Sequence, residues 1–104
     1  MRKKLPSQEI NLRRVIKSNI DYKILNFFHN SPSSIDTARG ISTWINEKRE
    51  DTKKSLDKLA KFKILLSLKN RFVVGYSYTQ DVNIVKKINR FLGNNKSNFN
   101  KLKE

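Results

Sequence analysis

The segment Asp36–Phe62, DTARGISTWINEKREDTKKSLDKLAKF, carries two runs of apolar residues at helical spacing. Apolar residues that are three or four positions apart lie on one face of a helix. Only the polar residues 46–49 separate the two runs, so the chain has room for a tight corner and nothing longer. The segment therefore predicts two short helices packed against each other, the second over about Arg49–Phe62. The apolar residues of the two runs are Ala38, Ile41, Trp44 and Ile45, then Leu56, Leu59, Ala60 and Phe62.

Three residues mark the boundaries and the packing of this helix pair. Asn46 stands where the first helix must end and the chain must reverse. That position often requires positive φ, which glycine adopts best and asparagine next. Asp36 is the predicted N-cap of the first helix. Gly40 costs about 1 kcal/mol relative to alanine inside a helix, so we expect it at a close contact between two helices.

The chain continues as KILLSLKNRFVVGYSYT, residues 63–79, with two β-rich runs. The runs 64–68 and 72–79 flank a basic Lys-Asn-Arg tip at 69–71, which predicts a β-hairpin. A two-stranded hairpin needs one apolar face to cover the helices, so we expect the alternating residues of its second strand in the core. We expect Trp44 there as well. The alternating residues are Phe72, Val74, Tyr76 and Tyr78.

Further helices flank this region on both sides. Ser18 and Asp21 have the spacing of a capping box, and the proline after Asn30-Ser31 ends the helix that they begin. Upstream, residues 1–9 form a basic arm. The apolar residues of 9–17 fit neither the helix nor the strand period cleanly, and a short helix is the expectation there. Downstream, Asp81 caps a last helix that we expect to end at Gly93, a glycine stop signal. The polar segment 94–104 is expected to be disordered, with weak docking of Phe99 and Leu102.

The order helix, helix, turn, helix, hairpin over Ile20–Thr79 resembles a winged helix-turn-helix. It is most similar to the small prokaryotic MarR- and ArsR-type regulators. The resemblance implies an α+β, mainly helical fold with a three-helix core, a two-stranded β-hairpin wing and an additional C-terminal helix. We therefore divide the chain into a basic arm with a short helix (1–17), a winged helix-turn-helix domain (18–80), a C-terminal helix (81–93) and a polar tail (94–104).

The resemblance also implies a double-stranded DNA-binding transcriptional regulator. In such a protein the helix 49–62 enters the major groove and the hairpin 63–79 is the wing. Aligned with the family pattern, Thr52 and Leu56 take the two core positions of this helix. Arginine and lysine beside them donate to guanine or to phosphate. We expect base contacts from Arg49 and Lys53, and phosphate contacts from Lys48, Lys54, Lys58, Lys69 and Arg71.

The charge of the chain favours a polyanionic partner. Its 104 residues include 23 Lys and Arg against 9 Asp and Glu, a net charge of +14. Nucleic acid is the first candidate, because neutralising phosphates releases counterions. The abundance of lysine and asparagine is also typical of AT-rich genomes, although that bias would raise glutamate too, and glutamate is scarce here.

Two other functions stay open. Acids lie among the cations of the helix 49–62, and the pairs Glu50–Lys54 and Asp57–Lys61 have the spacing of stabilising ion pairs on a solvated face. Such a face suits a winged-helix module that binds protein in a larger nucleic-acid-processing assembly. The aromatic hairpin suits an RNA or single-strand binder, with bases stacked on Tyr76 or Tyr78.

The last helix has more apolar residues than one docking stripe requires. In small regulators of this type a terminal helix often forms the dimer, and a two-fold dimer presents two recognition helices to successive major grooves. The alternative is packing across the helix that begins at Ser18. The residues we assign to the homodimer are Val85, Ile88, Phe91 and Leu92.

Catalysis, cofactors and membranes find no support in the sequence. Cysteine is absent, the single His29 has no identifiable catalytic partner, and three glycines form no phosphate loop. We therefore expect no catalytic residue, no cofactor and no metal site. There is no run of about 18 apolar residues for a membrane span and no apolar segment behind the basic N-terminus for a secretory signal. We expect a cytoplasmic protein that is not an enzyme.

Overall fold

The computed structural model describes the backbone of residues 11–103 and the side chains of residues 11–93. The fold is α+β and mainly helical, with a hairpin and a C-terminal helix, as predicted. The predicted basic arm at residues 1–9 lies outside the described residues. In chain order the elements are α1 (Leu12–Val15), α2 (Asn19–Asn30), β1 (Ile35–Thr37), α3 (Ala38–Ile45), α4 (Arg49–Lys61), β2 (Leu65–Lys69), β3 (Val74–Tyr78) and α5 (Val82–Lys103).

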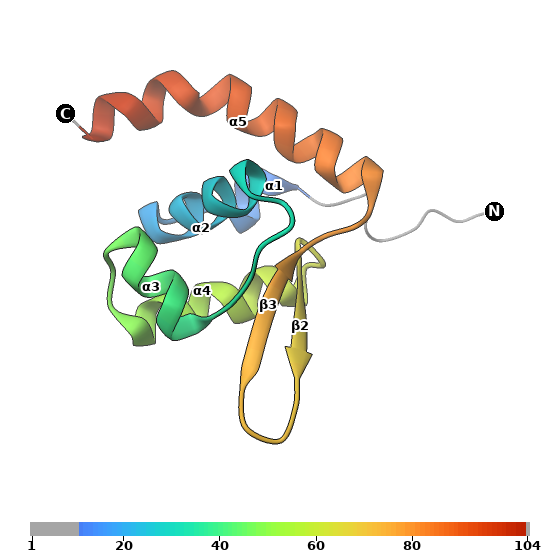
Figure 1. Cartoon of the computed structure of the whole chain (residues 1–104). Helices are drawn as coiled ribbons and strands as arrows, with labels where there is room; N and C mark the ends of the chain where they lie inside the picture. Colours follow the sequence, from blue (N-terminus) through green and yellow to red (C-terminus); the bar gives the residue numbers. More distant parts are fainter. Residues whose placement is uncertain (1–10, 104) are drawn as a thin grey trace.

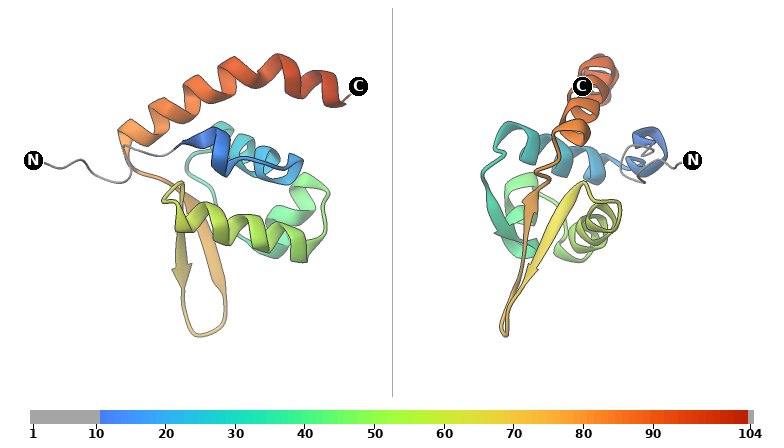
Figure 2. Two further views of the ribbon diagram at one scale, coloured as in Figure 1. Left: turned by 180° about the vertical axis from the view of Figure 1, so that it is seen from behind. Right: turned by 90° about the vertical axis from the view of Figure 1, so that its right-hand side faces the viewer.

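The three central helices α2, α3 and α4 pack against one another between two outer elements. Figure 1 shows α5 lying across one side of this unit, next to α1 and α2, while the β2–β3 hairpin projects from the other side. The further views in Figure 2 show the same separation. The exposed end of the hairpin is therefore remote from α5, and the two can act on different partners.

The core is built where the apolar faces of these elements meet. Thr52 and Leu56 on α4 are both fully buried, as the alignment predicted. The other fully buried large side chains come from α2, α3, the hairpin and α5. Because all of α4's buried residues share one face, the opposite face remains available. The largest members of the core are Tyr76, Tyr78, Phe28, Ile24, Leu25, Ile41, Leu59, Ile64, Leu65 and Ile88.

Two local predictions about helix ends are confirmed. Ser18 and Asp21 form a reciprocal capping box at the start of α2. Asn46 follows α3 with φ 58° and ψ 52°, and the amides of Asn46 and Glu47 donate to the carbonyls of Thr43 and Ser42. This left-handed ending sets the corner between α3 and α4.

The predictions for Asp36 and Gly40 were wrong in detail. The N-cap of α3 is Thr37, whose hydroxyl accepts from the amide of Gly40 at 3.1 Å. Asp36 instead accepts from the amide of Thr37 at 2.8 Å. A Cβ on Gly40 would collide with the carboxylate of Asp36, so this glycine makes room for a side chain of the preceding strand and not for another helix.

The wing belongs to a three-stranded antiparallel sheet of order β1-β3-β2, not to a two-stranded hairpin alone. Ile35 pairs with Ser77 and Thr37 with Gly75. The strand β1 has three residues and runs directly into α3, so it leaves no alternating pattern in the sequence. Its pairing with β3 ties the start of α3 to the wing.

Two aromatic residues predicted to be in the core are exposed. Trp44 is 72% exposed because it lies on the flank of α3. Its ring lies beside the ring of Phe27, with 6.3 Å between the centroids. Phe72 is 84% exposed because it precedes β3, in the part of the hairpin beyond the helices. Phe62, which belongs to the second apolar run of the helix pair, is exposed as well.

The last helix is longer than predicted. The expected end at Gly93 was wrong, and so was the disorder expected for the tail, because α5 continues to Lys103. Gly93 does not have positive φ, and one glycine costs a helix only about 1 kcal/mol. The predicted docking of Phe99 and Leu102 lies outside the described side chains.

Lys63 offers a test of the turn between α4 and β2. It has φ 68°, and the amides of Lys63 and Ile64 donate to the carbonyls of Ala60 and Leu59 at 3.0 Å. This is the Schellman ending, where glycine is the favoured residue. Lys63→Gly should therefore raise the free energy of unfolding by about 0.5–1 kcal/mol, measured by urea denaturation. The matched control, Lys54→Gly within α4, should lower it by about 1 kcal/mol; destabilisation by both variants would contradict the assignment.

Candidate nucleic-acid interface

An open groove of about 410 Å³ lies between the start of α3, the first half of α4 and β3. The groove brings together Arg49 and Lys53 from one flank of α4 with Arg39 from the first turn of α3. Arg39 belongs to a different helix from Arg49 and Lys53, but all three cations share one concave surface. The remaining lining residues are Thr37, Ala38, Phe72, Val73, Val74 and Tyr76.

Lys53 is held in the groove by two neighbours. Its ammonium donates to Asp57 Oδ2 at 2.9 Å and to the hydroxyl of Tyr76 at 3.3 Å. The Tyr76 hydroxyl in turn donates to Asp57 Oδ1 at 2.6 Å. The hydrogen bond that Lys53 donates to Asp57 is the main reason that the pKa of Lys53 is raised. Lys53 therefore stays a cation across the physiological range, and its third donor remains free for an anion.

The outermost ridge of α4 is polar and of mixed charge. Glu50, Lys54, Asp57 and Lys61 all lie on it and are exposed. The predicted pairs Glu50–Lys54 and Asp57–Lys61 do not form; the i,i+4 pair in this helix is Lys53–Asp57. Lys54 thus points to solvent without a carboxylate partner among the described residues.

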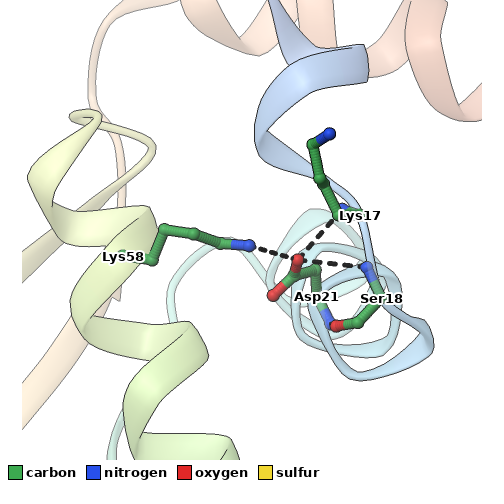
Figure 3. Close-up of polar contacts among 4 residues, drawn as sticks. All are labelled: Lys17, Ser18, Asp21 and Lys58. Atoms are coloured by element: carbon green, nitrogen blue, oxygen red, sulfur yellow. Dashed lines mark hydrogen bonds and ion pairs between the residues drawn. The ribbon is translucent and has the colours of Figure 1, made fainter.

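Lys58 is placed on the other flank of α4, away from the groove. Its ammonium pairs at 2.5 Å with Asp21 of α2, whose side chain is almost completely buried. Figure 3 shows this contact together with the bonds from the backbone amides of Lys17 and Ser18 to the same carboxylate. The sequence placed Lys58 among phosphate contacts, whereas its partner here is internal.

The tip of the hairpin carries the cations that the sequence assigned to the wing. Lys69 ends β2, Arg71 lies in the turn, and both are exposed. The turn is ordered by Asn70, whose Oδ1 accepts from the amides of Phe72 and Val73 at 2.8 and 3.0 Å. The wing therefore presents two cations on a defined loop.

Two further cations complete the surface. Lys48 is exposed at the N-terminus of α4, and its side chain makes no capping bond there. Arg39 was missed by the sequence reasoning. The sequence does contain a signal for Arg39. It follows Ala38, a predicted core residue at the start of a predicted helix, so its side chain is expected on the exposed side of that helix.

The aromatic face of the hairpin is not open to bases. Tyr76 and Tyr78 are 1% and 2% exposed, and Tyr78 stacks on Phe28 with centroids 6.3 Å apart. His29 lies against the same ring, with Nδ1 3.0 Å from the Tyr78 hydroxyl and Nε2 3.2 Å from Asn89 Oδ1. Both tyrosines are therefore core residues, and His29 joins α5 to them.

The residues assigned to a dimer are largely used within the chain. Ile88 is fully buried and Leu92 nearly so, as members of the hydrophobic core. Val85 and Phe91 are partly buried, and Phe91 contacts the ring of Tyr22. The first part of α5 thus packs across α2, the alternative that the sequence left open.

Other kinds of site are not found in the part of the chain that the structure describes. Within residues 11–93 no three His, Asp or Glu side chains come together as metal ligands. Over the same residues, no helix has the length and apolar character needed to cross a membrane.

Comparison with known proteins gives structural matches only. No family model and no curated protein matches the sequence. A possible transcriptional regulator from Methanosarcina mazei Go1 superposes with a TM-score of 0.60 at 19% identity, covering 88% of both chains. HlyU from Vibrio cholerae N16961 superposes with a TM-score of 0.63 at 12% identity, covering 83% of this chain and 89% of its own. The chain therefore has the winged helix-turn-helix fold of transcriptional regulators.

Proposed function

We propose that this protein is a cytoplasmic, non-enzymatic transcriptional regulator that binds double-stranded DNA. The observation that carries the proposal is the shared groove of Arg39, Arg49 and Lys53, which lies beside the basic wing. A concave surface that brings together cations from α3 and α4 next to a basic hairpin tip suits the phosphate backbone of a duplex. The similarity to transcriptional regulators supports the same function.

In the proposed complex α4 enters the major groove with its exposed ridge first. Arg49 and Lys54 reach base edges or the nearest phosphates, and Lys48 contacts a phosphate at the helix start. Lys53 serves as a phosphate ligand through its remaining donor, since Asp57 and Tyr76 already hold its ammonium. Lys69 and Arg71 meet the adjoining backbone or minor groove.

The acids of α4 weaken this interface less than their number suggests. Asp57 is neutralised by Lys53, and Glu47 lies beyond the helix in a 2.7 Å pair with Lys23 of α2. Glu50 and Asp51 occupy the first turn, where the helix dipole stabilises negative charge. An acid on the ridge also has a possible acceptor role toward cytosine N4.

We also propose a homodimer formed through α5. This helix of 22 residues is about 33 Å long at 1.5 Å per residue, which is long enough for a partner helix to pack along it. Such a pair would relate two α4 helices by a two-fold axis. Because Ile88 and Leu92 are buried within the chain, the partner would contact the partly buried Val85 and Phe91.

The test is selection from random-sequence duplexes at two salt concentrations, followed by sequencing. We expect binding that weakens as salt rises and a palindromic motif with half-sites one helical turn apart. A motif without a palindrome would support a sequence-specific regulator but contradict the proposed homodimer. Absence of duplex binding at low salt would overturn the proposal.

The second candidate is a protein-binding module, and one observation favours it. The exposed ring of Trp44 lines a second open hollow of about 400 Å³ with Phe27 and Ile35, on the other side of α3 from the basic groove. Exposed aromatic residues of this kind are enriched in protein interfaces. If duplex binding fails, Trp44→Ala is the next variant to test for loss of a partner.

A further inference from the structure

The end of the wing combines an exposed aromatic ring with positive charge. Phe72 is the most exposed of the large apolar residues in the described part of the chain. It follows directly after Arg71, and Lys69 lies on the facing strand. The adjacent Val73 is exposed as well, and neighbouring exposed apolar side chains with charged residues around them are typical of an interaction site. The ligand that fits this patch is apolar at its centre and anionic around it.

The ring is presented by an ordered turn. The amides of Phe72 and Val73 donate to Asn70 Oδ1, and the amide of Asn70 donates to the carbonyl of Val73 at 3.0 Å. These three bonds close the turn around Asn70. A preorganised loop loses less conformational freedom on binding than a mobile one, so Phe72 is suited to insertion into a narrow site.

The ring also faces the same side as the α4 cations. Phe72 and Val73 form one wall of the groove whose other wall holds Arg49 and Arg39. A duplex that meets Arg49 in its major groove therefore brings the neighbouring minor groove toward Phe72. The stacked bases of that groove are apolar, and the phosphates on either side match Lys69 and Arg71.

We propose that Phe72 is an apolar wedge that enters the minor groove, partly separates two stacked base pairs and bends the duplex. This inference rests on the proposed duplex binding and adds a DNA-bending role to it. Phenylalanine is among the residues that unstack base steps in this way. Flexible pyrimidine–purine steps yield most easily, so such a step is expected at the position that faces the wing.

The experiment uses the full chain and a duplex of about 30 base pairs that carries the selected motif, or a random sequence if no motif emerges. Fluorophores at the two ends report bending by energy transfer, and a fluorescent adenine analogue at the candidate step reports unstacking. The variants are Phe72→Ala, Phe72→Trp and, as a matched control, Leu66→Ala, an exposed apolar residue of the same hairpin outside the groove.

The wild-type protein should bring the duplex ends together and brighten the analogue. Phe72→Ala should abolish both signals and weaken affinity about tenfold with an unchanged salt dependence, while Phe72→Trp and Leu66→Ala should retain them. Binding without bending or unstacking overturns the wedge and leaves the proposed function intact. Loss of all duplex binding by the wild type overturns both, and a Phe72-dependent preference for single strands assigns the ring to base stacking instead.

Discussion

Asp21→Ala should lower the free energy of unfolding by about 2–4 kcal/mol, the largest loss we expect from a single polar substitution. The Asp21 carboxylate joins three segments: it accepts from the amides of Lys17 and Ser18 at 3.0 and 3.2 Å and pairs with Lys58 of α4. Alanine removes the capping box and leaves an ammonium facing a buried, polar gap. Partial solvent access to Lys58 keeps the loss below that of a fully buried pair.

Urea denaturation measures this loss, and Asp81→Ala is the matched control. Asp81 caps α5 with Oδ1 bonds to the amides of Asn83 and Ile84 but has no cation beside it among the described ion pairs. Its removal should therefore cost only about 1 kcal/mol. Equal losses from the two variants would show that the bridge from Asp21 to α4 adds nothing beyond capping.

The same carboxylate predicts a pH dependence. Burial alone would raise the pKa of Asp21, but the ammonium of Lys58 and the backbone amides outweigh it, and the pKa lies below its usual 3.8. Because the pKa of Asp21 is lower in the folded protein than in the unfolded chain, its ionised carboxylate stabilises the fold at pH values above the unfolded-state pKa. This stabilisation is lost as the pH falls through the folded-state pKa. Stability should thus fall below about pH 4, and less steeply in Asp21→Ala than in the wild type.

The double reversal Arg49→Glu with Lys53→Glu should weaken duplex binding about 100-fold at moderate salt. Both residues line the groove, and each change replaces attraction to phosphate with repulsion. The control is Arg13→Glu with Arg14→Glu, two exposed residues of α1, which alters the net charge equally and leaves the proposed dimer helix unchanged. Fluorescence anisotropy with a labelled duplex measures the affinities.

Folding must be checked in the same samples, because Lys53→Glu also places a second acid beside Asp57 and Tyr76. Lys53→Gln, which keeps a donor without the charge, separates that local strain from loss of phosphate contact. An equal loss in the α1 control would mean that net charge alone drives binding. Intact affinity in the groove variant, with the fold retained, would show that the proposed face is wrong.

Local signals in the chain were sufficient for the helix pair, the turn at Asn46, the capping box of Ser18 and Asp21, and the hairpin. Each depends on residues a few positions apart, so spacing and backbone preference are enough to predict it. The site residues Arg49, Lys53, Lys69 and Arg71 were named from the resemblance to winged helix-turn-helix regulators, and the structure places the first two in one groove.

Long-range packing decided the rest. The strand β1 exists because it pairs with β3 some forty residues later, and Lys58 turns inward because Asp21, 37 residues earlier, is buried beside it. Trp44 and Phe72 are exposed because no element covers them, although both stand in apolar runs. The hydrophobic pattern along a chain records which side chains are apolar, whereas their burial depends on which distant segment arrives to cover them.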